Sequence, residues 1–203
     1  MPKTKEQFEQ IKKERMDAIL NASLFLFATK GYNAVTTDEI TNYVGCSHGL
    51  LYHYFGSKED LFSTLMDKKV ITIMDSILAD IDFKAKPKFV LLDVIDALLE
   101  ATKSNDDEKA CAIYLVLNLH LQRKYIPKPK IKPGDCKKHW MEYAIEIIDK
   151  GKASGEFYDY NTKEMLVALL AFFKGLTYSR IYLGAKKFTC PKAEIISKMI
   201  IKS

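Results

Sequence analysis

The segment from Thr36 to Lys58 carries the side chains best suited to recognising another molecule. Two short stretches of helical pattern, 36–44 and 47–55, flank Gly45, where glycine supplies a left-handed turn. The second stretch gathers polar and aromatic side chains on one face: Ser47, His48, Gly49, Tyr52 and His53. A helix-turn-helix inserts such a face into the major groove of DNA, so we expect DNA contacts here. The alternative is a purely structural pair of helices, because helical hairpins are common.

Two other groupings have residue types that could do chemistry. His139, Glu142 and Glu146 recur at helical spacing, but carboxylate-bridged metal bundles need Glu-x-x-His pairs on two helices. The four cysteines, at positions 46, 111, 136 and 190, form no CxxC pair, so we expect structural thiols in a reducing cytoplasm. No nucleophile motif, phosphate-binding glycine loop or HExxH occurs. We therefore expect no enzyme, no metal site and no cofactor; a helical-bundle enzyme or metal-binding protein is the alternative.

Composition permits DNA as a partner without demanding it. The 203 residues are 48% hydrophobic, contain no run of 18 apolar residues and show no secretory signal at the start, which favours a cytoplasmic protein with no membrane partner. The net charge is +5, but residues 1–58 hold seven basic and six acidic side chains. We expect the acids Asp38, Glu39 and Glu59 to cap helices away from DNA. The bases expected to face DNA are Lys12, Lys13, Arg15, Lys30 and Lys58.

Apolar periodicity predicts an all-α fold of about nine helices. The expected helices cover residues 8–29, 36–44, 47–55, 57–81, 87–103, 108–122, 135–153 and 162–183, with a last one from 191. Thr36 and Ser57 are expected N-caps. The segment 123–138 has three prolines and seven basic residues against one acid, and we expect a loop there.

From about Arg15 to Leu61 the sequence closely resembles the TetR family of transcriptional regulators. The residues that carry this resemblance are Ile19, Ala22, Leu26, Phe27, Gly31, Tyr32, Thr36, Thr37, Ile40, Gly45, Ser47, Gly49, Leu51, Tyr52, Tyr54, Phe55, Ser57, Lys58, Glu59 and Leu61. The resemblance implies a three-helix helix-turn-helix DNA-binding domain in residues 1–56. A larger helical ligand-binding and dimerisation domain would follow in residues 57–203.

The resemblance also implies roles for single residues. The implied DNA-binding set is Thr36, Thr37, Ser47, His48, Gly49, Tyr52, His53 and Lys58. Thr36 and Thr37 would meet the phosphate backbone, and Lys58 would pair with a phosphate as a point charge. His48 is the candidate for contacting a base edge. The aromatic residues that follow it would contact phosphates or thymine methyl groups.

In the larger domain the sequence suggests an interface and a pocket. Small residues at helical spacing, together with the apolar stripe of the last helix, predict a homodimer interface of Ala168, Ala171, Gly175, Ser179, Ile196 and Met199. An internal packing seam is the alternative. Polar groups in apolar helices and aromatic side chains predict a ligand site of Tyr114, Asn118, His120, Trp140, Phe172 and Tyr178. Plain core packing is the alternative there.

These features predict a ligand-responsive DNA-binding regulator, a repressor released from its operator by a small apolar or aromatic molecule. Its partners would be double-stranded operator DNA, that ligand and a second copy of the chain. A DNA-binding regulator controlled by a protein partner, through the basic segment 123–138, is the alternative.

Overall fold

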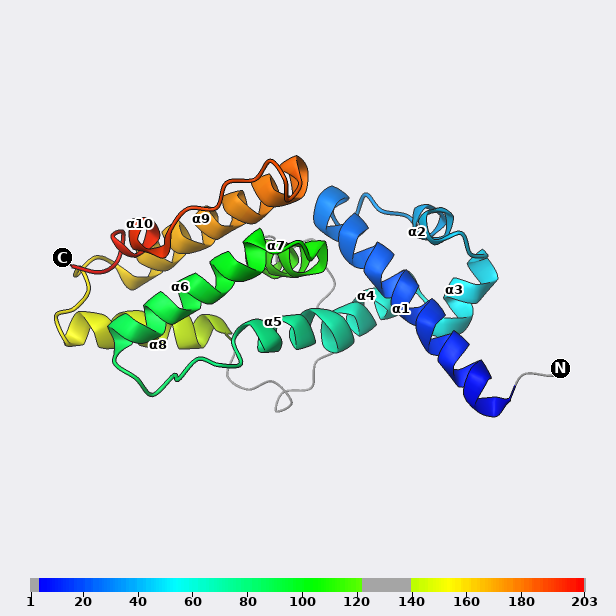
Figure 1. Cartoon of the computed structure of the whole chain (residues 1–203), viewed down its shortest axis with the longest axis horizontal. Helices are drawn as coiled ribbons and strands as arrows, with labels where there is room; N and C mark the ends of the chain where they lie inside the picture. The colour runs from blue at the N-terminus through cyan, green and yellow to red at the C-terminus, as the bar shows by residue number, and fades with distance from the viewer. Residues whose placement is uncertain (1–3, 122–139, 203) are drawn as a thin grey trace. The chain divides into compact units, whose positions relative to one another are not determined.

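The computed structural model describes residues 4–121 and 140–202, and the regular elements in these stretches are helical (Figure 1). Their one extended pairing is a single bridge between Phe157 and Ile201. The described residues divide into two compact units. The first runs to Thr72 and includes residues 119–121, and the second holds the rest. The predicted all-α fold is confirmed, whereas a domain boundary after residue 56 stays a prediction.

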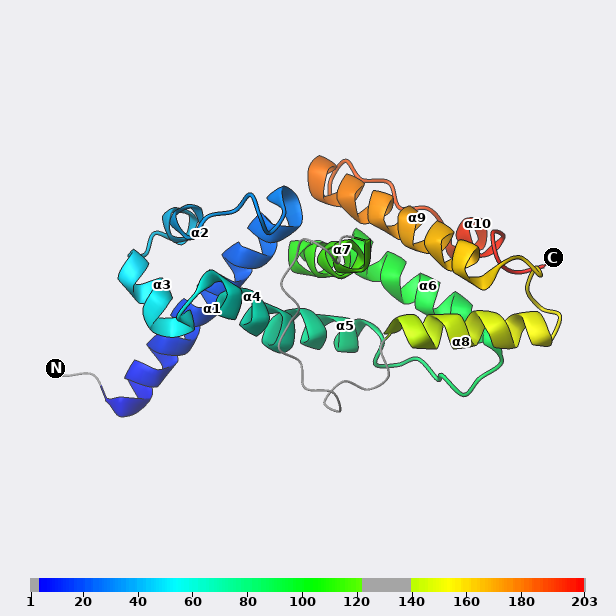
Figure 2. The ribbon, with the colours of Figure 1, turned by 180° about the vertical axis from the view of Figure 1, so that it is seen from behind.

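The first unit is a bundle of short helices around one long helix. α1 (Lys5–Lys30) packs against both α2 (Thr37–Val44) and α4 (Lys58–Leu65). α3 (His48–Phe55) packs against α2 and α4, so α2 and α3 form the helix-turn-helix (Figure 2). The predicted pair of short helices is therefore present.

Local capping sets the ends of these short helices. The hydroxyl oxygens of Thr36, Ser47 and Ser57 each accept a backbone N–H from the first turn of the helix that follows. Gly45 ends α2 in the left-handed conformation at φ 74°. The core beneath is apolar and fully buried, and it consists of Ile19, Leu24, Phe27, Ile40, Leu51, Leu61, Phe62 and Leu65. Capping and core together fix the angle between α2 and α3.

The helix that begins after Ser57 differs from its prediction. An uninterrupted helix over 57–81 was expected, but α4 passes into a π-helical turn, η1 (Met66–Val70), before α5 (Ile71–Ile77). Met66 and Val70, at the two ends of this wide turn, are both buried. The π turn thus begins and ends on a core side chain, and the helix ends four residues earlier than predicted.

The second unit packs its helices around α6 (Pro87–Lys103). α8 (Trp140–Ala153), α9 (Thr162–Leu183) and α10 (Ala193–Ser197) each contact α6, and α8 also contacts α9. α7 (Asp107–Leu121) completes this set of helices. The fully or nearly fully buried apolar side chains of this unit include Val90, Ile95, Leu99, Ile113, Ile148, Phe157, Met165, Phe173, Ile196 and Ile200.

α10 is shorter than the helix expected from residue 191 onward. Its helical turn covers five residues, and the chain then turns so that Ile200 and Ile201 are buried beyond it. Ile201 pairs with Phe157 in the single bridge. Part of the apolar pattern that predicted a longer helix thus lies outside the helix, where Ile201 pairs with the distant Phe157.

α9 is long and apolar enough, by length and mean hydropathy, to cross a bilayer. In the described structure it instead packs against α6 and α8. Its C-terminal part also holds Arg180, whose side chain is 1% exposed. Arg180 donates to the Ser104 carbonyl at 2.7 Å and pairs with Asp107 at 2.8 Å. These contacts tie α9 to the start of α7.

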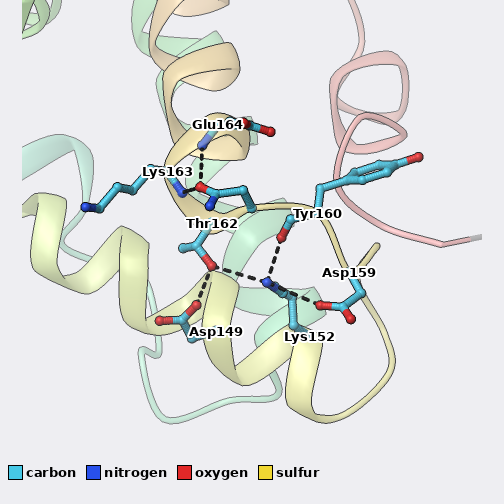
Figure 3. Close-up of polar contacts among 8 residues, drawn as sticks. Asp149, Lys152, Asp159, Tyr160, Thr162, Lys163 and Glu164 are labelled. Atoms are coloured by element: carbon cyan, nitrogen blue, oxygen red, sulfur yellow. Dashed lines mark hydrogen bonds and ion pairs between the residues drawn. The ribbon is translucent and has the colours of Figure 1, made fainter.

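A polar network joins α8 to α9 (Figure 3). The Lys152 ammonium donates to the Tyr160 carbonyl at 2.6 Å and lies 3.3 Å from a carboxylate oxygen of Asp159. The Thr162 hydroxyl donates to Asp149 at 2.5 Å, which links the first turn of α9 back to α8. The carbonyl oxygen of the Asn161 side chain accepts two backbone N–H groups as the N-cap of α9. This network holds the start of α9 against the end of α8.

Gly151 is required by the packing below this connection. The Phe157 ring is fully buried against it, and a Cβ at position 151 would lie 2.3 Å from a ring carbon. The Phe157 N–H also donates to the Gly151 carbonyl at 3.0 Å. Glycine is thus the residue that lets the chain fold back onto α8 at this point.

Candidate nucleic-acid interface

The first turn of α2 and the exposed side of α3 form one surface, which we call the α2–α3 face. Its residues are Thr36, Thr37, Asp38, Ser47, His48, Gly49, Tyr52 and His53, and each is exposed or half-buried. All of these residues except Asp38 are predicted DNA contacts. The remaining predicted contact, Lys58, lies at the start of α4. Caps and a shared buried core hold α2 and α3 against each other, so these residues lie on one surface.

Two polar links join the helices across the α2–α3 face. The Thr37 and Tyr52 hydroxyl oxygens lie 3.4 Å apart. At the next residue of α2, the Asp38 carboxylate contacts His48 Nε2. His48 and Tyr52 have ring centroids 6.1 Å apart, so the two links are neighbours. The start of α2 is therefore part of the same surface as the helix expected to enter the groove.

Asp38 is the residue of this surface that sequence reasoning missed. It was expected to cap a helix away from DNA, but Thr36 provides the α2 cap and the Asp38 side chain turns to His48 instead. This pairing is a tertiary contact between two helices, and whether Asp38 faces DNA stays a prediction. No local pattern marks a contact between side chains ten positions apart.

Lys58 is placed by an aromatic ring. Its ammonium lies 4.3 Å from the centroid of the Tyr32 ring, and the side chain is half-buried. Burial lowers the pKa of Lys58 from its ordinary value, with Glu59 opposing the shift. The Tyr32 hydroxyl donates to Glu59 at 3.0 Å; burial first, and this hydrogen bond second, raise the pKa of Tyr32. Lys58 is thus held at the start of α4 with limited freedom.

Lys30, another base expected to face DNA, is paired inside the unit. Its ammonium contacts the Glu39 carboxylate, which links the end of α1 to α2. The pair neutralises one of the seven basic charges of residues 1–58. Non-specific attraction to a phosphate backbone is correspondingly small, since it depends on unpaired Lys and Arg.

The predicted ligand residues of the second unit are only partly brought together. The rings of Tyr114 on α7 and Tyr178 on α9 have centroids 5.9 Å apart. Tyr178 is 50% exposed and also stacks on Tyr182, so it lies at the surface of the single chain. The other predicted residues with described side chains, all half-buried, are Asn118, Trp140 and Phe172. The side chain of His120 lies outside the described residues.

An exposed stripe of small and apolar residues runs along α9. Ala171 and Gly175 are exposed, Ala168 and Ser179 are half-buried, and Val167, Tyr178 and Tyr182 flank them at the surface. A Cβ at Gly175 would meet no atom within 4 Å inside the chain. Met199 is 41% exposed, whereas Ile196 is fully buried in the chain's own core and offers no surface to a partner.

The described cysteines are not activated nucleophiles. Burial raises the pKa of Cys111 to about 12, and burial is also the main cause that raises the pKa of Cys46 and Cys190. Within residues 4–121 and 140–202, no group of three or more His, Cys, Asp or Glu side chains is placed to hold a metal ion. His139, Cys136 and the basic segment 123–138 lie outside the described residues.

Comparison with known sequences identifies relatives over part of the chain. The sequence model described as "Bacterial regulatory proteins, tetR family" matches residues 19–65, which include α2 and α3. The HTH-type transcriptional repressor BdcR of Escherichia coli is 36% identical over 99 residues, or 48% of each chain. The HTH-type transcriptional regulator QacR of Staphylococcus aureus is 43% identical over 51 residues, 25% of this chain and 27% of QacR. The chain spans about half or less of the length of these two relatives.

Comparison with solved structures extends the likeness to nearly the whole chain. A tetR-family regulator from Agrobacterium tumefaciens is 19% identical with a TM-score of 0.64, covering 95% of this chain and 100% of that one. A transcriptional regulator from Saccharomonospora viridis, solved in complex with choline, is 19% identical with a TM-score of 0.57, covering 94% and 100%. At these identities the likeness shows that the fold is shared.

Proposed function

The chain belongs to the tetR family of bacterial regulatory proteins, and on this premise we propose that it is a transcriptional repressor. It would act in the cytoplasm, bind double-stranded operator DNA as a homodimer and leave the operator when a small molecule binds. The observation that carries the proposal is the α2–α3 face, a rigid, exposed, polar and aromatic surface on a helix-turn-helix.

The α2–α3 face has the groups that a major-groove interface needs. His48 and Gly49 open α3, so the polar and sterically small end of this helix would enter the groove. Thr36 and Thr37, at the start of α2, would donate to phosphates, and Lys58 would add a point charge. Since residues 1–58 carry nearly balanced charge, specific contacts would supply more of the affinity than in a strongly basic domain.

The second unit would hold the ligand. The ring of the exposed Tyr178 lies beside the half-buried Tyr114 and, with the half-buried Phe172, offers apolar and aromatic surface on α7 and α9. Such surfaces suit flat or apolar molecules, and the faces of aromatic rings also attract organic cations. The choline complex of the Saccharomonospora viridis protein supports a ligand role for this fold. A ligand would release DNA only by preferring the form that binds the operator poorly.

Substitutions on the α2–α3 face test the DNA-binding function. We expect His48→Ala to lower affinity for the operator by about 1–3 kcal/mol and to change the preference at one base pair per half-site. Lys58→Ala should weaken binding to all duplexes alike. It should also reduce the slope of the logarithm of affinity against the logarithm of salt concentration by about one. Fluorescence anisotropy titrations at several salt concentrations measure both effects. If both variants bound every duplex like the wild type, the α2–α3 face would not be the DNA interface.

The stripe on α9 would form the homodimer interface. We expect Gly175→Leu to convert the dimer to monomer, because overpacking at a close helix contact costs about 1–3 kcal/mol per chain. The added side chain meets no atom near its Cβ inside the chain, so the helix content should not change. Sedimentation velocity measures the assembly state, with Asp96→Leu on the exposed side of α6 as the control. A Gly175→Leu protein that stayed dimeric would contradict this interface.

A further inference from the structure

The link between Asp38 and His48 has a consequence for which base pair the protein prefers. We infer that Asp38 and His48 act as one base-recognition unit, in which Asp38 selects a cytosine through its exocyclic amino group in the major groove. The inference rests on the proposed DNA-binding function and deepens it. It assigns a sequence-determining role to a carboxylate on the surface proposed to bind DNA.

Asp38 lies in the first turn of α2, where a negative charge is favourable, but its carboxylate does not cap this helix. The cap of α2 is the Thr36 hydroxyl, which accepts the Glu39 N–H at 3.1 Å. The hydrogen bond from Thr41 goes to the Asp38 backbone carbonyl, which any residue would provide. The Asp38 side chain is 72% exposed, so it contributes little to the core. What the carboxylate does make is the contact with His48.

That contact holds the carboxylate at the opening of α3. His48 is the first residue of α3, and its ring lies beside Tyr52 on the α2–α3 face. A second link between the helices, from Thr37 to Tyr52, lies next to it. Asp38 is thereby held beside His48, which would meet a base edge. A restrained side chain loses less freedom on binding than a mobile one.

The chemistry of the carboxylate favours one base. Bonding to His48 uses Oδ1, and an ionised carboxylate has further acceptor positions on its second oxygen. In the major groove only cytosine N4 and adenine N6 present amino donors. Adenine places the N7 acceptor beside its amino group, and this lone pair repels a carboxylate, whereas cytosine has no such neighbour. Cytosine is therefore the preferred partner of Asp38.

A competing explanation makes the opposite prediction. If Asp38 were only a negative charge near phosphates, its removal would strengthen binding to every duplex by a similar factor. If Asp38 recognises cytosine, its removal abolishes preference at one position in each half-site. The two explanations differ in the base profile and not only in affinity.

The experiment uses the full-length protein and a randomised duplex library, from which the wild type selects its operator. Anisotropy titrations then measure wild type, Asp38→Ala and Asp38→Asn on duplexes with each base pair of one half-site replaced. We expect the wild type to prefer cytosine at one position by at least about fivefold. Asp38→Ala should reduce that preference to within about twofold. Asp38→Asn should shift it to adenine, because asparagine pairs with N6 and N7.

Two controls separate the outcomes. Asp96→Ala removes one exposed acid from α6 and should leave the profile unchanged. The double variant Asp38→Ala/His48→Ala should lose no more discrimination than its more affected single variant, since partners in one unit are not additive. An unchanged base profile in Asp38→Ala, with tighter binding to all duplexes, would overturn the inference. Failure of the wild type to select any sequence would instead overturn the proposed function.

Discussion

Replacing Gly151 with alanine is expected to lower the free energy of unfolding of the second unit by about 3 kcal/mol, the upper end of the usual cost of overpacking. The added Cβ would lie 2.3, 2.4 and 2.6 Å from three carbons of the Phe157 ring. Phe157 is fully buried, so its ring cannot move aside without disturbing the core. The clash outweighs the roughly 1 kcal/mol by which alanine is favoured over glycine inside a helix. Urea denaturation followed by circular dichroism measures the change.

Two further variants show whether the Phe157 ring is the cause. Gly49→Ala is also a helical substitution, but its added Cβ meets no atom within 4 Å, so it should not destabilise the first unit. In Gly151→Ala/Phe157→Leu the smaller side chain leaves room for the methyl group. Its destabilisation should be less than the sum of the two single effects. Additive effects would show that Gly151 and Phe157 are not coupled.

Removing Asp107 is expected to cost about 3 kcal/mol or more, although this residue lies largely in solvent. Its partner Arg180 is buried, and Asp107→Ala would leave that positive charge without its counter-ion. Arg180 Nε already has no hydrogen-bond partner, so the buried guanidinium has little other compensation. The loss should be measurable by urea denaturation as a lower midpoint with an unchanged slope.

The reverse substitution should be much milder. Arg180→Met keeps most of the buried volume, removes the unpaired Nε–H and leaves Asp107, 68% exposed, in water. We expect a change within about 1 kcal/mol, because buried ion pairs are often replaced by apolar residues without loss. Asp96→Ala, which removes an exposed acid on α6, should change stability by no more than about 0.5 kcal/mol. If Arg180→Met were the more damaging variant, the ion pair itself would be the main stabilising feature.

Features encoded within a few residues could be predicted from the sequence. The Thr36 and Ser57 caps and the Gly45 turn depend on neighbouring backbone groups, and each is found where expected. Features that depend on distant contacts could not be predicted. The last helix is shorter than predicted. Part of the apolar pattern lies beyond its end, where Ile201 pairs with Phe157. The π turn, whose end residues Met66 and Val70 are both buried, likewise has no sequence signal of its own.

The candidate site divides in the same way. Exposed residues on α3 followed from helical spacing and from the family resemblance. The Asp38 contact with His48 depends on the angle between two helices, and the burial of Arg180 depends on its contact with Asp107, which is distant in the sequence. Which of these residues touch DNA or ligand stays a prediction. Side-chain pairing across elements is the information that the sequence alone lacks.

Trp140, at the start of α8, also makes the two units distinguishable by spectroscopy. It is the only tryptophan of the chain and belongs to the second unit. Intrinsic tryptophan fluorescence therefore follows the second unit alone, whereas far-ultraviolet circular dichroism follows the helices of both. Chains with more than one compact unit need not unfold in a single step. A difference between the two signals during denaturation would separate the stability of the first unit from that of the second, without labelling or truncating the protein.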